Sequence, residues 1–113
     1  MPLIFPHPPF VAAEPWFSLH DRADVPLPID RSQTAHGKPA FMDAYREIYG
    51  WDDIDEDGYR EITATYYGMV SRTDDQLRRL MEAVDLAGQA DRTGWIYGTD
   101  HGEYLGDLSL IHI

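Results

Sequence analysis

The 113-residue sequence contains no cysteine, few basic side chains and no long hydrophobic run. Without cysteine there can be no disulfide, no thiolate metal site and no thiol nucleophile. Nine lysines and arginines stand against twenty aspartates and glutamates, and the resulting net charge of −11 argues against nucleic acid or an anionic membrane surface as a partner. No apolar stretch approaches the roughly 20 residues of a membrane-spanning helix. These absences leave an acidic chain that is either one small domain or a piece of a larger one.

The apolar content, 43% hydrophobic with 12% aromatic residues, is high enough for a core. The strongest periodic pattern lies between residues 59 and 87, where apolar side chains recur every three or four positions. Asp57 stands at a suitable N-cap position and Gly88 where a helix often ends. We therefore predict one long helix over residues 59–87, in which Gly68 permits close packing.

Two shorter elements flank this helix in the prediction. Residues 40–49 carry apolar side chains at helical spacing, and Gly50 ends that run. After the long helix, an apolar run beginning at Trp95 predicts a buried strand over residues 95–99. A helix, a short loop and a strand form half of an α/β unit, whose strands bind ligands at their carboxyl ends.

The first candidate site is the pair Asp100 and His101, directly after the predicted strand. Gly98 and Gly102 on either side allow a sharp turn, which both side chains need in order to reach one ion. A carboxylate and an imidazole together form a reasonable half-site for a divalent cation. The alternative is an aspartate and a histidine in an ordinary surface turn.

The second candidate is His7, which is enclosed by Pro6, Pro8 and Pro9. Proline makes the backbone rigid, and a rigid backbone suits an imidazole that is aimed at an anionic oxygen. The alternative is a loop histidine with an ordinary hydrogen bond.

The third candidate is the acidic run at residues 53–58, which copies the first half of an EF-hand calcium loop. Such a loop needs a glutamate at its twelfth position, and here that position is Ala64. An acidic helix N-terminus that complements the helix dipole is the simpler interpretation.

Three segments in this order resemble the sulfatase family of the alkaline-phosphatase-like superfamily, which is close to the arylsulfatases and the phosphonate monoester hydrolases. They are PHPPF at residues 6–10, ATYYGMVSRTDDQL at 64–77 and TDHGEYLGD at 99–107. The resemblance implies an α/β fold, of which this chain is a partial slice of the doubly wound sheet. It further implies that residues 1–107 are the middle part of a catalytic domain, incomplete at both ends. Residues 108–113 depart from the family and resemble translated sequencing adapter.

The same resemblance implies that Asp100 and His101 bind the active-site divalent metal, with calcium as the first expectation and manganese as the alternative. It implies that His7 contacts the sulfate or the leaving group. The family's nucleophile is a formylglycine made from cysteine or serine in a Cys/Ser-x-Pro-x-Arg motif. This chain contains no such motif, so the formylglycine is expected in a missing N-terminal part.

The implied function is metal-dependent hydrolysis of small-molecule or glycan sulfate esters, or of phosphate or phosphonate esters. The 113-residue chain itself is then expected to be inactive, because it lacks the nucleophile. Two other functions stay open from the residues alone. One is an acidic calcium-binding module centred on residues 53–58, and the other is a helical interaction domain.

Overall fold

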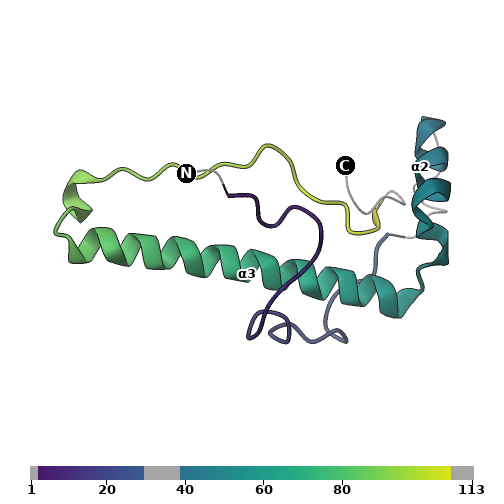
Figure 1. Ribbon diagram of the computed structural model, residues 1–113, viewed down its shortest axis with the longest axis horizontal. Coiled ribbons are helices and arrows are strands. Elements are labelled where there is room, and N and C mark those ends of the chain that lie inside the picture. Colours follow the sequence, from purple (N-terminus) through teal and green to yellow (C-terminus); the bar gives the residue numbers. More distant parts are fainter. Residues whose placement is uncertain (1–2, 30–38, 108–113) are drawn as a thin grey trace.

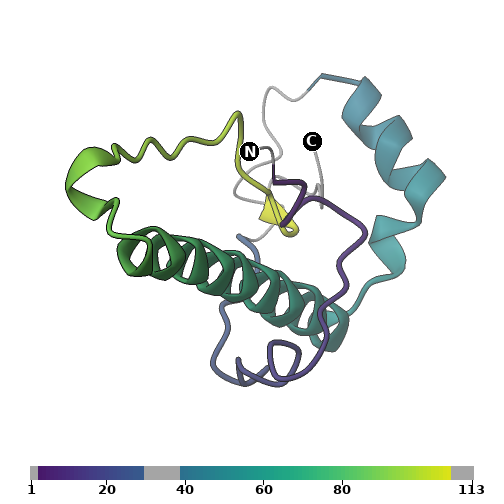
Figure 2. The same ribbon diagram turned by 60° about the vertical axis from the view of Figure 1, so that its left-hand side comes forward.

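The computed structural model describes residues 3–29 and 39–107. One long helix dominates them, α3 (Glu56–Leu86), accompanied by the shorter α2 (Phe41–Tyr49) and by two single-turn 3-10 helices, η1 (Trp51–Asp53) and η2 (Ala90–Arg92). In Figures 1 and 2, α2 lies beyond the N-terminal end of α3, the N-terminal segment crosses α3, and the segment after η2 runs back along it. None of the helices in the described ranges is long and apolar enough to cross a membrane.

The ends of α3 are set by local capping. The side chain of Asp55 accepts a hydrogen bond from the Gly58 amide at 2.9 Å, so Asp55 is the N-cap. Asp57, the predicted N-cap, lies in the first turn, where its charge complements the helix dipole. Gly88 follows the helix with a φ of 66°, in the left-handed region that glycine favours. The predicted helix over 59–87 is therefore confirmed, and it begins three residues earlier, at Glu56.

The N-terminal segment packs onto α3 at a glycine. Gly68 is buried, and a Cβ added there would overlap the backbone carbonyl oxygen of Trp16. The next residue, Met69, is fully buried with 0% of its surface exposed. The prediction that Gly68 permits close packing is confirmed, because the backbone of the N-terminal segment takes the space of its missing side chain.

The shorter helix is also confirmed. α2 begins at Phe41, and Gly50 ends it in the left-handed conformation with a φ of 65°. Its buried side chains are Met42 and Arg46, of which Arg46 forms an ion pair with Asp52. The aromatic and aliphatic side chains on its other face are exposed: Phe41, Tyr45, Ile48 and Tyr49.

The predicted buried strand over residues 95–99 is wrong for this structure. Residues 93–99 have no regular secondary structure, and Ile96 is as exposed as in an extended chain, at 102%. A strand needs a neighbouring strand to bond its backbone, and residues 3–29 and 39–107 contain none. The apolar run indicated a segment suited to burial, but the described part of the chain provides nothing to cover it.

Candidate active site

His7 lies in a tight loop and its ring is held by the backbone. Its amide donates to the Ile4 carbonyl at 2.9 Å, and its ring Nδ1 lies 2.7 Å from the Pro8 carbonyl oxygen. Because a carbonyl only accepts hydrogen bonds, Nδ1 carries the proton of this contact. In the neutral ring Nε2 then holds the lone pair, and it becomes a donor only when the ring is protonated.

The residues on both sides of His7 fasten its loop to α3. The Arg72 guanidinium lies over the Phe5 ring, 4.7 Å from its centroid. The Phe10 and Tyr66 rings meet edge to face, with centroids 6.0 Å apart. Contacts of these two kinds are each worth about 0.5–1 kcal/mol, so the loop is positioned from both ends.

Asp100 and His101 are exposed and form a compact turn of local hydrogen bonds. The Asp100 carboxylate accepts the His101 amide at 3.1 Å, and the Thr99 hydroxyl donates to the His101 carbonyl at 2.7 Å. Nδ1 of His101 lies 2.8 Å from the Gly102 carbonyl oxygen, to which it must donate. This leaves the lone pair on Nε2, and a metal-binding histidine commonly has its second ring nitrogen bonded in this way.

The electrostatic surroundings of His101 favour its protonated form. The hydrogen bond to the Gly102 carbonyl raises its pKa above 6.5, and the negative charges of Asp100 and Glu103 raise it further. A metal competes with this proton, because only the neutral imidazole binds it. Metal binding at His101 is therefore expected to strengthen as the pH rises.

The two motif loops lie on the same side of α3 (Figures 1 and 2). Tyr66, on α3, contacts the His7 loop. Its ring contacts Phe10 of the His7 loop, and its pKa is raised first by burial and then by the negative charge of Glu103 and by Tyr97. Reasoning from the sequence placed Tyr66 on a helix and missed this role. The only feature of the sequence that pointed to Tyr66 was its position in the apolar stripe of the helix.

The donor set fits part of a metal site. Asp100 offers a carboxylate oxygen and His101 an imidazole nitrogen, a combination that divalent cations accept. Within residues 3–29 and 39–107, no three histidine, aspartate, glutamate or cysteine side chains gather around a common point. As metal ligands, the pair would therefore form only part of a site and would need further ligands.

The end of the Asp100 turn is anchored to the start of α3. Oδ1 of Asp107 accepts the Ile29 amide at 2.7 Å. Gly106 is buried with a φ of 105°, and a Cβ there would lie 2.6 Å from both Pro28 Cγ and Tyr59 Cε1. Residues far apart in the sequence thus meet at the end of the segment that carries Asp100 and His101.

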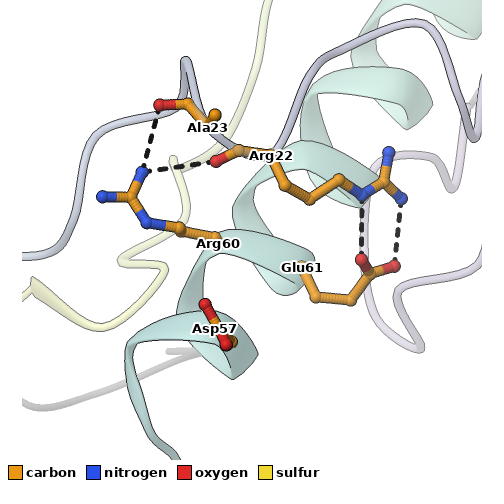
Figure 3. A pocket seen from close by; sticks show the side chains of 5 residues that line it. All are labelled: Arg22, Ala23, Asp57, Arg60 and Glu61. Atoms are coloured by element: carbon orange, nitrogen blue, oxygen red, sulfur yellow. Dashed lines mark hydrogen bonds and ion pairs between the residues drawn. The ribbon is translucent and has the colours of Figure 1, made fainter.

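A solvent-open hollow of about 550 Å³ lies at the start of α3, away from the motif residues (Figure 3). Arg22 donates to both carboxylate oxygens of Glu61, at 2.8 and 3.0 Å, and Arg60 donates to the carbonyls of Arg22, Ala23 and Val25. The hydrogen bond of the ion pair raises the pKa of Arg22 and lowers that of Glu61. These contacts tie the N-terminal segment to α3, which gives the hollow a structural role.

The acidic run at residues 53–58 covers the end of η1 and the start of α3. Asp55 caps the helix, and Ala64, the twelfth position of the would-be loop, is buried within α3. This geometry favours the acidic helix N-terminus.

Comparison with known proteins decides the family. Residues 31–111 match the Sulfatase family, which is well over half of the chain. The chain belongs to the sulfatase family. Membership implies the alkaline-phosphatase-like α/β fold, although the described residues of this chain contain helices and no strand.

The sulfatase-family chain is similar to several curated proteins. It is 35% identical over 120 residues to a multifunctional alkaline phosphatase superfamily protein, PehA, of Trinickia caryophylli, with 94% of this chain and 23% of the relative covered. It is 22% identical to an arylsulfatase of Clostridium perfringens (strain 13 / Type A), over 95% of this chain and 22% of the relative. A choline-sulfatase of Rhizobium meliloti (strain 1021) is 23% identical, over 93% of this chain and 21% of the relative. The chain thus spans less than a quarter of these relatives' length, and no solved structure matches it.

Proposed function

We propose that this chain is part of a metal-dependent hydrolase of sulfate esters, with small-molecule or glycan esters as substrates. The observation that carries the proposal is the family match over residues 31–111, which includes Asp100 and His101. The names of two relatives, an arylsulfatase and a choline-sulfatase, support sulfate esters as the substrate class. Phosphate or phosphonate esters are the second candidate, because the relative at 35% identity is described as multifunctional.

Asp100 and His101 take the role of metal ligands in this proposal. The carboxylate would supply an oxygen, and the Gly102 carbonyl orients the His101 ring so that Nε2 would supply the nitrogen. These two residues would hold a divalent cation, calcium or in second place manganese, which would supply charge neutralisation at the ester oxygens. The remaining ligands would come from parts of a longer protein.

His7 takes the role of a hydrogen-bond donor to a sulfate oxygen or to the leaving group. Because Nδ1 is engaged with the Pro8 carbonyl, a contact with the substrate would use Nε2. The rings of Phe5 and Phe10 hold the loop on α3, so the imidazole is positioned before any substrate arrives.

The nucleophile is the missing component. The sequence has no cysteine and no Ser-x-Pro-x-Arg motif, so no residue of this chain can become the formylglycine. We therefore expect residues 1–107 to be the middle of a catalytic domain and the isolated 113-residue chain to be inactive. The assignment of residues 108–113 as a departing tail lies outside the described residues and stays a prediction.

Manganese titration followed by NMR tests the metal half-site in the chain itself. Paramagnetic Mn²⁺ should broaden the amide signals of residues 99–103, and Asp100→Ala should abolish that broadening. Asp55→Ala, which removes a carboxylate of the competing acidic run, should leave it intact. Broadening centred on residues 53–58 that survives Asp100→Ala would favour the calcium module instead, and no broadening at either place would argue against the half-site.

A hydrolysis assay tests the expected inactivity. The purified chain should not hydrolyse p-nitrophenyl sulfate with Ca²⁺ or Mn²⁺ present. Hydrolysis that disappears in Asp100→Ala would contradict the view that the nucleophile lies elsewhere.

A further inference from the structure

A small, solvent-open groove lies between the N-terminal segment and α3. Its volume is about 220 Å³. An apolar cavity of about 150 Å³ is already large enough for a benzene-sized molecule, so the groove has room for one six-membered ring. The residues that line it come from both elements: Phe10, Ala12 and Phe17 from the N-terminal segment, and Glu61, Ile62 and Thr65 from α3.

Both phenylalanine rings of the groove are held in place by another side chain. The Phe10 ring meets that of Tyr66 edge to face, with centroids 6.0 Å apart. The guanidinium of Arg22 lies over the Phe17 ring, 4.4 Å from its centroid. Contacts of these two kinds favour one orientation of a ring. A ligand that enters the groove therefore does not have to order its aromatic walls, a cost that would otherwise weaken binding.

One part of the lining is polar. The Glu61 carboxylate accepts hydrogen bonds from Arg22 at 2.8 and 3.0 Å and from the Thr65 hydroxyl at 3.4 Å. Within residues 3–29 and 39–107 it receives these three bonds, whereas a carboxylate can accept about four. Because the Glu61 side chain is 49% exposed, a ligand can reach it. The groove thus offers a hydrogen-bond acceptor to a molecule that carries an O–H or N–H group.

The charges around the groove favour a neutral molecule. A negative group would be repelled by the Glu61 carboxylate, in a chain whose net charge is −11. A positive group would be repelled by Arg22, which is already paired with that carboxylate. A neutral hydroxyl or amine avoids both penalties.

We propose that this groove binds a small, neutral aromatic molecule with one hydrogen-bond donor, of the phenol class. The ring would pack against Phe10, Phe17 and Ile62, and the hydroxyl would donate to the Glu61 carboxylate. Small-molecule sites are typically lined in this way, by apolar and aromatic side chains with a few polar groups that fix the orientation. The site is independent of the proposed function, because its lining includes neither His7 nor the Asp100–His101 pair.

A phenol titration of the full 113-residue chain, followed by the amide NMR signals, tests the proposal. The signals of Ala12, Phe17 and Ile62 should shift and saturate, with a dissociation constant of about 1 mM for so small a ligand. Toluene has nearly the same shape but no donor, and it should bind about fivefold more weakly because one hydrogen bond is lost. Benzoate should bind about tenfold more weakly than phenol, because its charge meets that of Glu61.

Two phenylalanine variants locate the binding. Phe17→Ala removes one wall of the groove and should weaken phenol binding about tenfold. Phe41→Ala is the matched control, since Phe41 is an exposed phenylalanine on α2, outside the groove lining, and it should leave the affinity unchanged. Equal weakening in both variants would mean that phenol adheres to exposed rings in general, and this would overturn the proposal.

The parent chain alone gives a second decision, in case Phe17→Ala does not fold. Shifts that spread over Phe41 and Tyr97 without saturating, or no shifts at the groove, would overturn the site. Toluene binding as tight as phenol binding would overturn the role of Glu61 as the hydrogen-bond acceptor.

Discussion

The two halves of α3 share one apolar pattern but differ in what stabilises them. Its buried residues all lie between positions 63 and 73: Thr63, Ala64, Thr65, Gly68, Met69 and Thr73. No residue of 74–86 is buried, and Met81 and Leu86 are 50% and 89% exposed. The first half packs against the N-terminal segment, whereas the second half relies on local ion pairs of Arg78 with Asp75 and Glu82.

The difference shows that periodicity predicts a helix and a face, but not what covers that face. The N-terminal segment crosses only the first half of α3 (Figure 1). Since the chain spans less than a quarter of its relatives' length, we expect the apolar face of the second half to meet parts of the domain that this chain does not contain. Burial in the first half should therefore carry most of the stability that mutations can remove.

A pair of methionine substitutions gives the largest expected contrast. Met69→Ala should lower the free energy of unfolding by about 2–5 kcal/mol, because it leaves a cavity at a fully buried position. Met81→Ala, at a half-exposed position, should cost no more than about 0.5 kcal/mol. Urea denaturation followed by far-UV circular dichroism measures both.

Met69→Leu is the control for the case in which Met69→Ala does not fold. Because leucine has a similar volume, this substitution should lower the free energy of unfolding by less than about 1.5 kcal/mol. Equal losses in Met69→Ala and Met81→Ala would remove the distinction between the two halves.

Substituting alanine for two glycines tests the close packing of the N-terminal segment on α3. In an open helix, Gly68→Ala would add about 1 kcal/mol of stability from helix propensity alone. Here the new Cβ meets the Trp16 carbonyl, so we expect a net loss of about 1–3 kcal/mol. Gly94→Ala, where an added Cβ meets nothing within 4 Å, should change stability by less than about 0.5 kcal/mol. The same urea denaturation measures both variants. A Gly68→Ala variant that is more stable than the parent would mean that the N-terminal segment does not lie on α3.

The sequence predicted the features that depend on neighbouring residues. The bounds of α3 came within three residues although the predicted N-cap was Asp57 and the observed one is Asp55. Its end at Gly88 and the end of α2 at Gly50 followed from the glycines. The roles of His7 and of the Asp100–His101 pair stay predictions from their motifs, and the carbonyls that orient their rings belong to the next residue in each case.

The features that the sequence did not predict depend on contacts between distant segments. The run at 95–99 is apolar enough for a buried strand, but burial requires a partner that the pattern cannot specify. The bond of Asp107 to Ile29 spans 78 positions, and the Tyr66 ring meets that of Phe10 in the N-terminal segment. Such contacts carry no local signal, so only the structure could identify them.

The smallest expected effect concerns the ion pair that joins the N-terminal segment to α3. The pKa of Glu61 is lowered, first by its hydrogen bond with Arg22, so the pair adds stability above the ordinary glutamate pKa of 4.5 and loses it as the pH falls through the lower folded value. The pKa of Arg22 is raised from an already high value and adds no pH dependence below neutrality. Since the Glu61 side chain is 49% exposed, screening limits the contribution to about 0.2–1 kcal/mol.

Glu61→Gln should therefore lower stability at pH 7 and flatten its decline between about pH 5 and pH 3, as measured by urea denaturation across that range. Glu82→Gln is the matched control, because Glu82 pairs with Arg78 within the exposed half of α3 and joins no second segment. Its pH profile should follow that of the parent. If the two variants gave the same profile, the bond between distant segments would contribute no more than a local surface pair, and the first half of α3 would owe its stability to apolar packing alone.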